Sequence, residues 1–331
     1  MKVAAALHVA TLSWLWIAAV TATTTTAATT TAATTTADVA VSTHERFADH
    51  SHSRKRLKVL LIGDSVDRNL LMDYCRFREA KLCSTIDEYG GKYNTTNCTS
   101  QGSFPDTLSS LFDFSKRIFP WGVVICDDDE RDVSIGFLFN TQGVSPHPPW
   151  FWPEKSSVGL ENVTFSNVRE MFTLTQGPAI APLLRGLGGN IDAYMVNSLF
   201  WDIGRLVTGE LGRNGGGDIC ANPYMRAEFV NSWAHNASFF LKTLDSYFPD
   251  AGWKAWRTSN QIMNAIPPCR NNMVHAMNRA SFFFARKLNF KWMNLFSYPD
   301  ISIKMRDSHH PNSNASASFM EKVLRVIRKE I

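Results

Sequence analysis

The sequence predicts an α/β fold of three layers, in which helices cover both faces of a mainly parallel central sheet. Three observations predict it. Short apolar runs rich in β-branched residues recur, long amphipathic segments lie between them, and the first apolar run ends at a glycine that opens a helical pattern. Strands that alternate with helices form parallel sheets covered by those helices. With 331 residues, 44% of them hydrophobic, the chain can build one large core.

The expected strands and helices alternate along the folded part of the chain. Residues 57–62 form the first apolar run, and a helical pattern over 66–77 follows Gly63 and the two residues after it. Further strands are expected, in chain order, over 123–126, 133–139 and 191–197, and weaker ones over 253–258 and 290–295. The other expected helices are 225–247 and 273–288. Ligand sites of such sheets form at the carboxyl ends of the strands, where Ser65 and Asn197 are expected.

The N-terminal residues predict entry into the secretory pathway. A lysine precedes an apolar run, and small residues up to Ala22 suit signal peptidase, so residues 1–22 form a signal peptide or, if uncleaved, a single membrane anchor. Residues 23–53 include a long Thr/Ala-rich tract that cannot build a packed core, so we expect a disordered stalk. The folded domain is expected over 54–331. It would be secreted, or would face the lumen of the Golgi or the cell exterior.

Cysteines and glycosylation signals agree with that compartment. The six cysteines permit three disulfides in an oxidising lumen, although buried free thiols would give the same even count. Five Asn-x-Ser/Thr signals are candidate N-glycan sites, and they begin at Asn94, Asn97, Asn162, Asn236 and Asn314.

The charge pattern disfavours nucleic-acid binding. The chain has 34 basic and 30 acidic side chains, and the basic ones are scattered apart from one cluster at 54–58. A nucleic-acid-binding protein gathers its positive charge on one face. The acidic run 127–132 is expected to be a solvated turn rather than a cation site, because charge runs usually lie in solvent. We therefore expect no nucleic-acid partner and no metal site.

Gly63-Asp64-Ser65 is the first candidate for catalysis. A serine hydroxyl needs a base that takes its proton, and it needs exposure at a turn where glycine relieves the tight backbone. A helix that begins there offers N–H groups to a developing oxyanion. An ordinary turn with serine as the helix N-cap would use the same residues. The position directly after a buried strand favours the nucleophile.

A base is expected near the C-terminus, in the segment Asp307-Ser308-His309-His310. An aspartate fixes the tautomer of a catalytic histidine and stabilises its cation. Asp307 and His310 are close enough for one turn of chain to supply both. In an extended chain His309 would also share a face with Asp307, so it remains an alternative base. A solvated pair of histidines is the non-catalytic alternative.

Asn197, at the end of an expected strand, completes a recognisable order of residues. Its uncharged amide suits an oxyanion hole, although asparagine also caps turns. Gly-Asp-Ser early, Asn in the middle and Asp-x-x-His late resemble the SGNH hydrolase superfamily. Residues 63–69, Gly-Asp-Ser-x-x-Arg-Asn, resemble its PC-esterase and trichome-birefringence-like branch. The segments 197–202 and 256–258 are similar to later blocks of that branch. The resemblance covers roughly residues 57–325.

The resemblance implies a flavodoxin-like α/β/α fold and a role for individual residues. Ser65 would be the nucleophile, His310 the base and Asp307 its orienting partner. The oxyanion hole would be formed by the Ser65 N–H, Asn197 and a glycine, namely Gly143 or its rival Gly136. No metal or organic cofactor is implied.

The late block departs from the plant members of that branch. Their block usually reads Asp-Cys-x-His-Trp, whereas Ser308 replaces the cysteine here and Pro311 follows the histidine. The disulfide expected at that cysteine is missing, so plant substrates should not be assumed.

Two further features concern substrate binding. Trp150 and Trp152 belong to a proline-rich aromatic stretch that would either line a sugar-binding groove or rest on the core. Arg68 would either pair with an acid on the substrate or brace the nucleophile turn.

These residues together predict a serine esterase or O-acyltransferase. It would act on O-acyl groups, acetyl above all, of a glycan or another acylated substrate through an acyl-Ser65 intermediate. A non-catalytic secreted module that keeps the fold for glycan or protein binding is the alternative, because fold does not fix function. A hydrolase of phosphate esters or lipids is a third reading.

Overall fold

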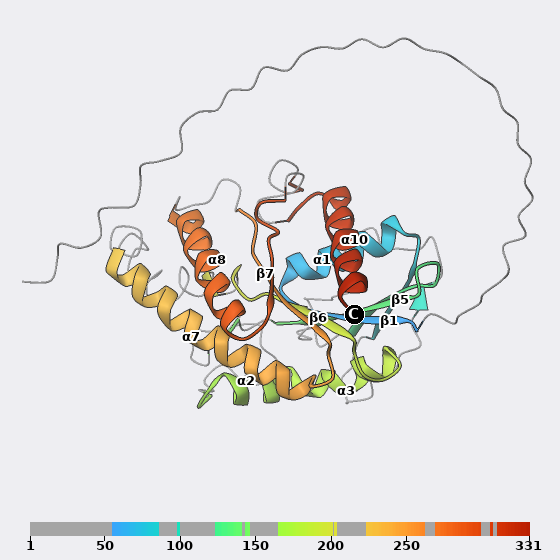
Figure 1. Ribbon diagram of the computed structural model, residues 1–331, viewed down its shortest axis with the longest axis horizontal. Coiled ribbons are helices and arrows are strands. Elements are labelled where there is room, and N and C mark those ends of the chain that lie inside the picture. The colour runs from blue at the N-terminus through green and yellow to red at the C-terminus, as the bar shows by residue number, and fades with distance from the viewer. Residues whose placement is uncertain are drawn as a thin grey trace, which may run out of the picture. The chain divides into compact units, whose positions relative to one another are not determined.

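The computed structural model describes the folded part of the chain with several gaps (Figure 1). The described residues are 55–85, 98–99, 123–140, 143–145, 165–200, 202–203, 223–261, 269–298, 305–306 and 310–331. Several sequence predictions fall outside them, namely those for the leader and stalk, Asn94, Asn97, Asn162, Trp150, Trp152, Asp307 and His309.

One mixed sheet forms the centre of the domain. In the described residues it has eight strands in the order β3-β2-β4-β5-β1-β6-β7-β8. The strands are β1 (Leu57–Gly63), β2 (Lys81–Thr85), β3 (Cys98–Thr99), β4 (Val123–Asp128), β5 (Val133–Phe139), β6 (Ala193–Val196), β7 (Trp253–Arg257) and β8 (Lys291–Met293). The five strands from β5 to β8 in this order are parallel, as predicted.

The other edge of the sheet is antiparallel, which the sequence did not predict. β4 pairs with β5, β2 with β4 and β3 with β2, each in antiparallel register. Only residues 129–132 separate β4 from β5, and so short a connection permits a hairpin but no parallel crossover. The predicted α/β class is therefore confirmed, with a parallel half and an antiparallel edge.

β1 lies between β5 and β6 in the parallel half of the sheet and is buried on both faces. Leu60 and Ile62 contact one hydrophobic cluster, while Val59 and Leu61 contact the other. This alternation follows from the two-residue period of a strand. Burial of each aliphatic side chain contributes about 1.5–3 kcal/mol to the free energy of folding. The near-continuous apolar run therefore favours a position for β1 inside the sheet.

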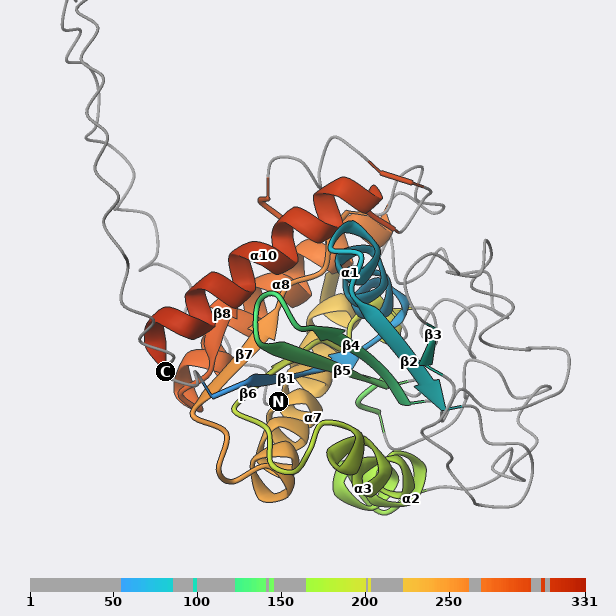
Figure 2. The same ribbon diagram turned by 90° about the vertical axis from the view of Figure 1, so that its right-hand side faces the viewer.

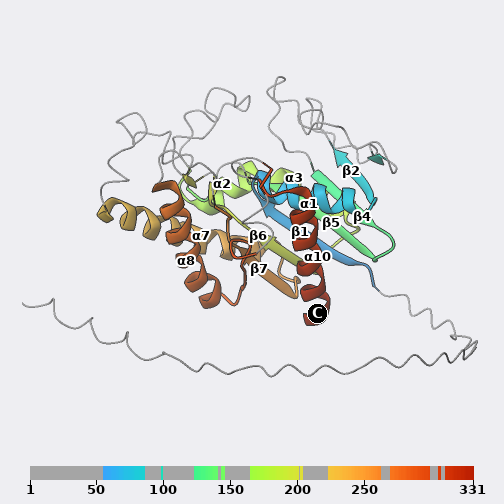
Figure 3. The ribbon, with the colours of Figure 1, turned by 90° about the horizontal axis from the view of Figure 1, so that it is seen from above.

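Helices cover both faces of the sheet, as the sequence predicted. They are α1 (Ser65–Phe77), α2 (Val168–Thr175), α3 (Gly177–Gly186), α7 (Pro223–Tyr247), α8 (Cys269–Lys287) and α10 (Ser313–Glu330). α1 and α10 share one cluster, and Figures 1 and 2 show them together on one side of the sheet. α2, α3, α7 and α8 belong to the other cluster, and α7 and α8 lie side by side (Figure 3). None of the described helices is long and apolar enough to cross a membrane.

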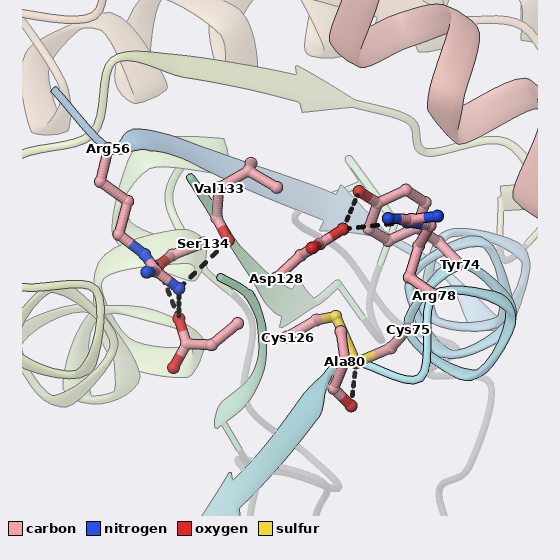
Figure 4. The surroundings of a disulfide bond; sticks show 10 residues. Arg56, Tyr74, Cys75, Arg78, Ala80, Cys126, Asp128, Val133 and Ser134 are labelled. Carbon is pink, nitrogen blue, oxygen red and sulfur yellow. Dashed lines mark hydrogen bonds and ion pairs between the residues drawn. A yellow bond between two sulfur atoms is a disulfide. The ribbon is translucent and has the colours of Figure 1, made fainter. Parts of the chain in front are cut away.

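A disulfide joins α1 to the sheet. Cys75, near the end of α1, is bonded to Cys126 of β4 (Figure 4). Cys83 in β2 is disulfide-bonded as well. None of the cysteines whose side chains the structure describes is a free thiol.

The acidic run 127–132 is not wholly the solvated turn that the sequence predicts, because Asp127 and Asp128 belong to β4 and Asp128 is buried. Several of its carboxylates pair with cations of this protein. Asp129 lies 2.7 Å from the guanidinium of Arg56. Asp128 accepts hydrogen bonds from Tyr74 and Arg78 (Figure 4). No group of acidic, histidine or cysteine side chains that could hold a metal ion is found in the described part of the chain.

Candidate active site

The turn between β1 and α1 presents Ser65 at the carboxyl edge of the sheet. Asp64 caps α1, because its carboxylate accepts a hydrogen bond of 2.8 Å from the backbone N–H of Val66. Asp67 reciprocates by accepting a bond of 3.2 Å from the Asp64 N–H. This capping box fixes the first turn of the helix, so Ser65 begins α1 where helix N–H groups lack intrahelical partners.

Gly63 is required at this turn because the Asp67 carboxylate fills the space beside it. A Cβ atom at residue 63 would lie 1.9 Å from Asp67 Oδ2 and 3.3 Å from the carbonyl oxygen of Asn197. No side chain fits there unless Asp67 moves, and Asp67 is fully buried. The glycine of the Gly-Asp-Ser motif therefore has a steric reason that the sequence alone did not reveal.

The side chain of His310 contacts that of Ser65 at the carboxyl ends of the parallel strands. Its Nε2 atom lies 2.8 Å from Ser65 Oγ, although 245 residues separate the two in sequence. Both residues are half-buried. The predicted contact between this serine and this histidine is confirmed, while the orienting role of Asp307 stays a prediction. A neutral imidazole in this place can accept the serine proton.

Asn197 lies where the sequence predicts, but its amide is used inside the protein. Its backbone N–H donates to Ile62 at 2.9 Å, which places it beside the end of β1. The side chain is fully buried, and Nδ2 donates to the carbonyl of Arg257 at 2.7 Å and to Ser259 Oγ at 3.2 Å. Contact with a substrate oxygen would require Asn197 to give up one of these bonds, so its place in an oxyanion hole stays a prediction.

Of the two candidate glycines, only Gly143 lies near the carboxyl edge. Gly136 is inside β5, where it pairs with Leu60, and a Cβ there would contact Leu183 and Leu187. Gly143 lies in the loop after β5 with φ of +66°, a conformation that favours glycine. A Cβ at residue 143 would lie 2.3 Å from Asp202 Oδ1. The Gly136 alternative is therefore dropped.

Asp202 holds the loop that carries Gly143. Its Oδ1 accepts a hydrogen bond of 3.0 Å from the backbone N–H of Val144. Its Oδ2 accepts bonds from Ser198 Oγ at 2.8 Å and from Trp233 Nε1 at 3.1 Å. Asp202 thus connects the loop after β5 to the segment after β6 and to α7.

Arg68 packs into the nucleophile turn. It is buried one turn after Ser65, with its guanidinium carbon 5.9 Å from the centre of the Phe139 ring. Burial lowers the pKa of Arg68 to about 10, against the attraction of Asp64, so it stays a cation at neutral pH. Of the two alternatives from the sequence, this burial favours the bracing one.

A buried ion pair contacts the turn that carries Ser65. Arg257, at the end of β7, donates to Asp67 through Nε at 2.6 Å and Nη2 at 2.7 Å. Nη2 also lies 3.8 Å from Asp64. Burial raises the pKa of Asp67 to about 6, while Arg257 opposes this rise. No sequence pattern predicted this pair, although Arg257 lies in the strand expected over 253–258.

Comparison with known proteins adds distant structural likenesses. None of the protein-family models and none of the curated proteins compared with the chain matches it. Among solved structures, a protein described as a GDSL-like lipase from Parabacteroides merdae has 11% identity and a TM-score of 0.43, over 82% of this chain and 97% of that one.

Two carbohydrate esterases of known structure show similarly low identity and TM-score to this chain. An acetyl-xylooligosaccharide esterase from Geobacillus has 12% identity and a TM-score of 0.40, over 82% of this chain and 94% of that one. A family two carbohydrate esterase from Cellvibrio japonicus has 12% identity and a TM-score of 0.35, over 82% and 62%. At these scores the likeness carries no functional conclusion for this chain.

Proposed function

We propose that this protein is an SGNH-type serine esterase or O-acyltransferase that acts on O-acyl groups. The observation that carries the proposal is the 2.8 Å contact between Ser65 Oγ and His310 Nε2 at the carboxyl edge of the sheet. A hydroxyl at the start of a helix, beside an imidazole, has what a covalent acyl-transfer mechanism needs from its nucleophile and base.

The proposed reaction has two halves. His310 takes the proton of Ser65 as Oγ attacks the acyl carbonyl, and the oxyanion forms near the Ser65 N–H at the start of α1 and the loop of Gly143. Collapse of this intermediate breaks the bond to the alcohol, which leaves with the proton from His310. The acyl-Ser65 ester then reacts with water, or with a second hydroxyl, whose proton His310 accepts. The bond between the acyl carbon and Ser65 Oγ breaks, and His310 returns the proton to Ser65. Asp307 is the proposed partner that orients His310.

The proposed substrate is an O-acetylated glycan, and its support comes from the sequence. The aromatic stretch with Trp150 and Trp152 suits the apolar faces of sugar rings. The acceptor decides between the two reactions, because water gives a hydrolase and a sugar hydroxyl gives a transferase. Release of free acetate from an acetylated oligosaccharide, compared with the appearance of acetate on a second sugar, separates them.

The proposed location is the secretory pathway. The leader, the stalk and the candidate glycan sites support it, and so do the disulfides in the described part of the chain. Of the candidate sites, Asn314 is exposed at the start of α10, while Asn236 is half-buried inside α7. In a eukaryotic host the protein should lose mass on treatment with an N-glycan-cleaving enzyme. An unchanged mass with a cytosolic distribution would contradict this location.

Labelling with a fluorophosphonate tests the nucleophile. The wild type should be labelled on the peptide that contains Ser65 and should hydrolyse nitrophenyl acetate. Ser65→Ala should abolish both, with a loss of at least about a thousandfold in turnover if the route is covalent. Ser246→Ala is the matched control, because the Ser246 hydroxyl donates to the carbonyl of Thr243 in its own helix. Labelling that persists in Ser65→Ala would overturn the assignment.

A further inference from the structure

The segment before His310 is tied to α1 at a second point. Arg306 Nη2 lies 2.7 Å from Asp73 Oδ1 and 2.6 Å from Asp73 Oδ2. The Asp73 side chain is 3% exposed, whereas that of Arg306 is 34% exposed. The same nitrogen donates to Ser313 Oγ at 2.6 Å. Arg306 thus reaches from the segment that carries His310 to a buried carboxylate on α1.

Arg306 and His310 are joined directly through their backbones. The backbone N–H of Arg306 donates to the carbonyl of His310 at 2.8 Å. Met305 and Pro311 pair on either side of it as an isolated antiparallel bridge. Because these contacts join the backbone at Arg306 to the backbone at His310, a displacement of Arg306 should displace His310 as well.

Both points of contact lie on one helix. Ser65 begins α1 and Asp73 follows about two turns later. The contact of His310 with Ser65 and that of Arg306 with Asp73 are therefore about 12 Å apart along the helix axis. A single contact would fix only the distance between His310 and α1. Two contacts also fix the direction from which the imidazole approaches the serine.

We propose that Asp73 and Arg306 are positioning residues that hold His310 against Ser65. This inference rests on the proposed function, because it assigns the pair a task within that site. The pair sets the position of the base without touching the substrate. Misplacement of a catalytic group by about 1 Å can cost roughly a hundredfold in rate, so loss of the pair should act on catalysis.

A purely structural role makes a different prediction. Arg306 also contacts Ser313, the first residue of α10, so the pair could serve only to join α10 to α1. In that case a variant would lose stability with no effect on the reactivity of Ser65. A matched control is the pair Arg131 and Glu321, 2.9 Å apart, which ties α10 to the turn before β5. The Arg131 side chain is 36% exposed, close to the value for Arg306.

The kinetic test compares Arg306→Gln, Asp73→Asn, the double variant and Arg131→Gln. We expect kcat for nitrophenyl acetate and the rate of fluorophosphonate labelling to fall about 10- to 100-fold in each single variant of the pair, with KM little changed. The double variant should be no worse than the worse single one, because the two residues act as a unit. Arg131→Gln should keep the wild-type rates. Unchanged rates in folded Arg306→Gln, or equal losses in Arg131→Gln, would overturn the proposal.

Two further measurements keep the test decisive. If Asp73→Asn does not fold, Arg306→Lys serves instead, because a lysine retains one bond to Asp73 and should recover part of the rate lost in Arg306→Gln. The ring resonances of His310, assigned with His310→Gln, give a reading that needs no turnover. They should shift in Arg306→Gln and not in Arg131→Gln.

The two proposals fail in different ways. If the wild type is neither labelled nor active while the His310 resonances still shift in Arg306→Gln, the proposed function fails and the positioning contact stands. If the wild type is active and neither rates nor resonances change in Arg306→Gln, the positioning role fails and the proposed function stands.

Discussion

Asp67 and Arg257, which are 190 residues apart in sequence, are joined by two hydrogen bonds of 2.6 and 2.7 Å with both side chains fully buried. The pair connects the first turn of α1 to the end of β7, two elements that meet behind Ser65. Because Asp67 also accepts a hydrogen bond from the Asp64 N–H, the pair fixes the conformation of the turn that carries Ser65.

Replacing one member of this pair should lower the free energy of unfolding much more than replacing both. Arg257→Met leaves the Asp67 carboxylate buried without its partner, and we expect a loss of about 3–5 kcal/mol in the free energy of unfolding. The double variant with Asp67→Asn should recover a good part of that loss. Urea unfolding near neutral pH measures both. Lys55→Gln, which breaks an exposed pair with Asp192, is the control and should leave the denaturation midpoint in place. Additive losses in the double variant would contradict the coupling.

The same pair predicts a pH dependence of stability. Burial raises the pKa of Asp67 to about 6, whereas an aspartate in an unfolded chain titrates near about 3.9. Between about pH 4 and pH 6 the folded protein therefore holds a proton that the unfolded chain has released. The contribution of this group is complete below about pH 4 and is lost as the pH rises through about 6. The shift corresponds to roughly 3 kcal/mol at most.

Comparison with Asp67→Asn isolates this contribution. The asparagine does not titrate, so the wild type should lose free energy of unfolding relative to the variant between about pH 4 and pH 7. Urea unfolding curves at several pH values measure the difference. A difference that moves in favour of the wild type as the pH rises would show that the attraction of Arg257 outweighs burial, contrary to our expectation.

Gly63 should tolerate no side chain while Asp67 is present. A Cβ at residue 63 would lie 1.9 Å from Asp67 Oδ2, so Gly63→Ala should displace the carboxylate, lower stability by at least about 1–3 kcal/mol and abolish most activity. In an Asp67→Ala background the further cost of Gly63→Ala should be much smaller, because the blocking oxygen is gone. Gly252→Ala is the control, since a Cβ at residue 252 would lie 4.0 Å from the carbonyl oxygen of Asp192, the nearest atom outside its chain neighbours. Thermal unfolding of the four variants tests this; equal costs of Gly63→Ala in both backgrounds would refute the steric explanation.

Features that depend on neighbouring residues could be predicted from the sequence. The strand over 133–139 coincides with β5, and the helices expected over 66–77 and 225–247 differ from α1 and α7 by one or two residues at the start. The turn at Ser65 followed from a strand that ends in glycine. Its contact with His310 rather than His309 followed from the Asp-x-x-His spacing together with the resemblance to SGNH hydrolases. Such patterns are local, or compare whole segments, and therefore remain visible in the sequence.

Features set by partners far apart in the chain could not be predicted. β2 has only five residues, Lys81–Thr85, and they show no polar/apolar alternation that would mark a strand. Nothing in the residues around Asp67 points to Arg257, because an ion pair leaves no periodic signal. Asn197 could be placed at the end of a strand, but the direction of its amide depends on Ser259 and the end of β7, which fold beside it.

The loop of Gly143 provides the last prediction, which concerns the oxyanion hole. Three donors converge on the Asp202 carboxylate, from Val144, Ser198 and Trp233. Asp202→Asn keeps the shape but replaces one acceptor by an N–H donor, so one of these groups would face a donor and the loop should shift. If Gly143 contributes to the oxyanion hole, kcat should fall by at least about tenfold, with a small change in KM. Complete loss of an oxyanion donor lowers kcat by about a hundredfold or more, which is the upper end of the expected effect.

Asp245→Asn is the matched control for that substitution. Asp245 also accepts hydrogen bonds from the protein, from Tyr194 at 2.6 Å and Lys254 at 2.9 Å, but it serves residues of β6 and β7 away from their carboxyl ends. Its variant should lose stability and keep kcat, because nothing it holds reaches the carboxyl edge. Steady-state kinetics with nitrophenyl acetate, run on both variants at matched folded fractions, measures the contrast. Equal values of kcat in the two variants would separate Gly143 from catalysis and leave the oxyanion to the N–H groups at the start of α1.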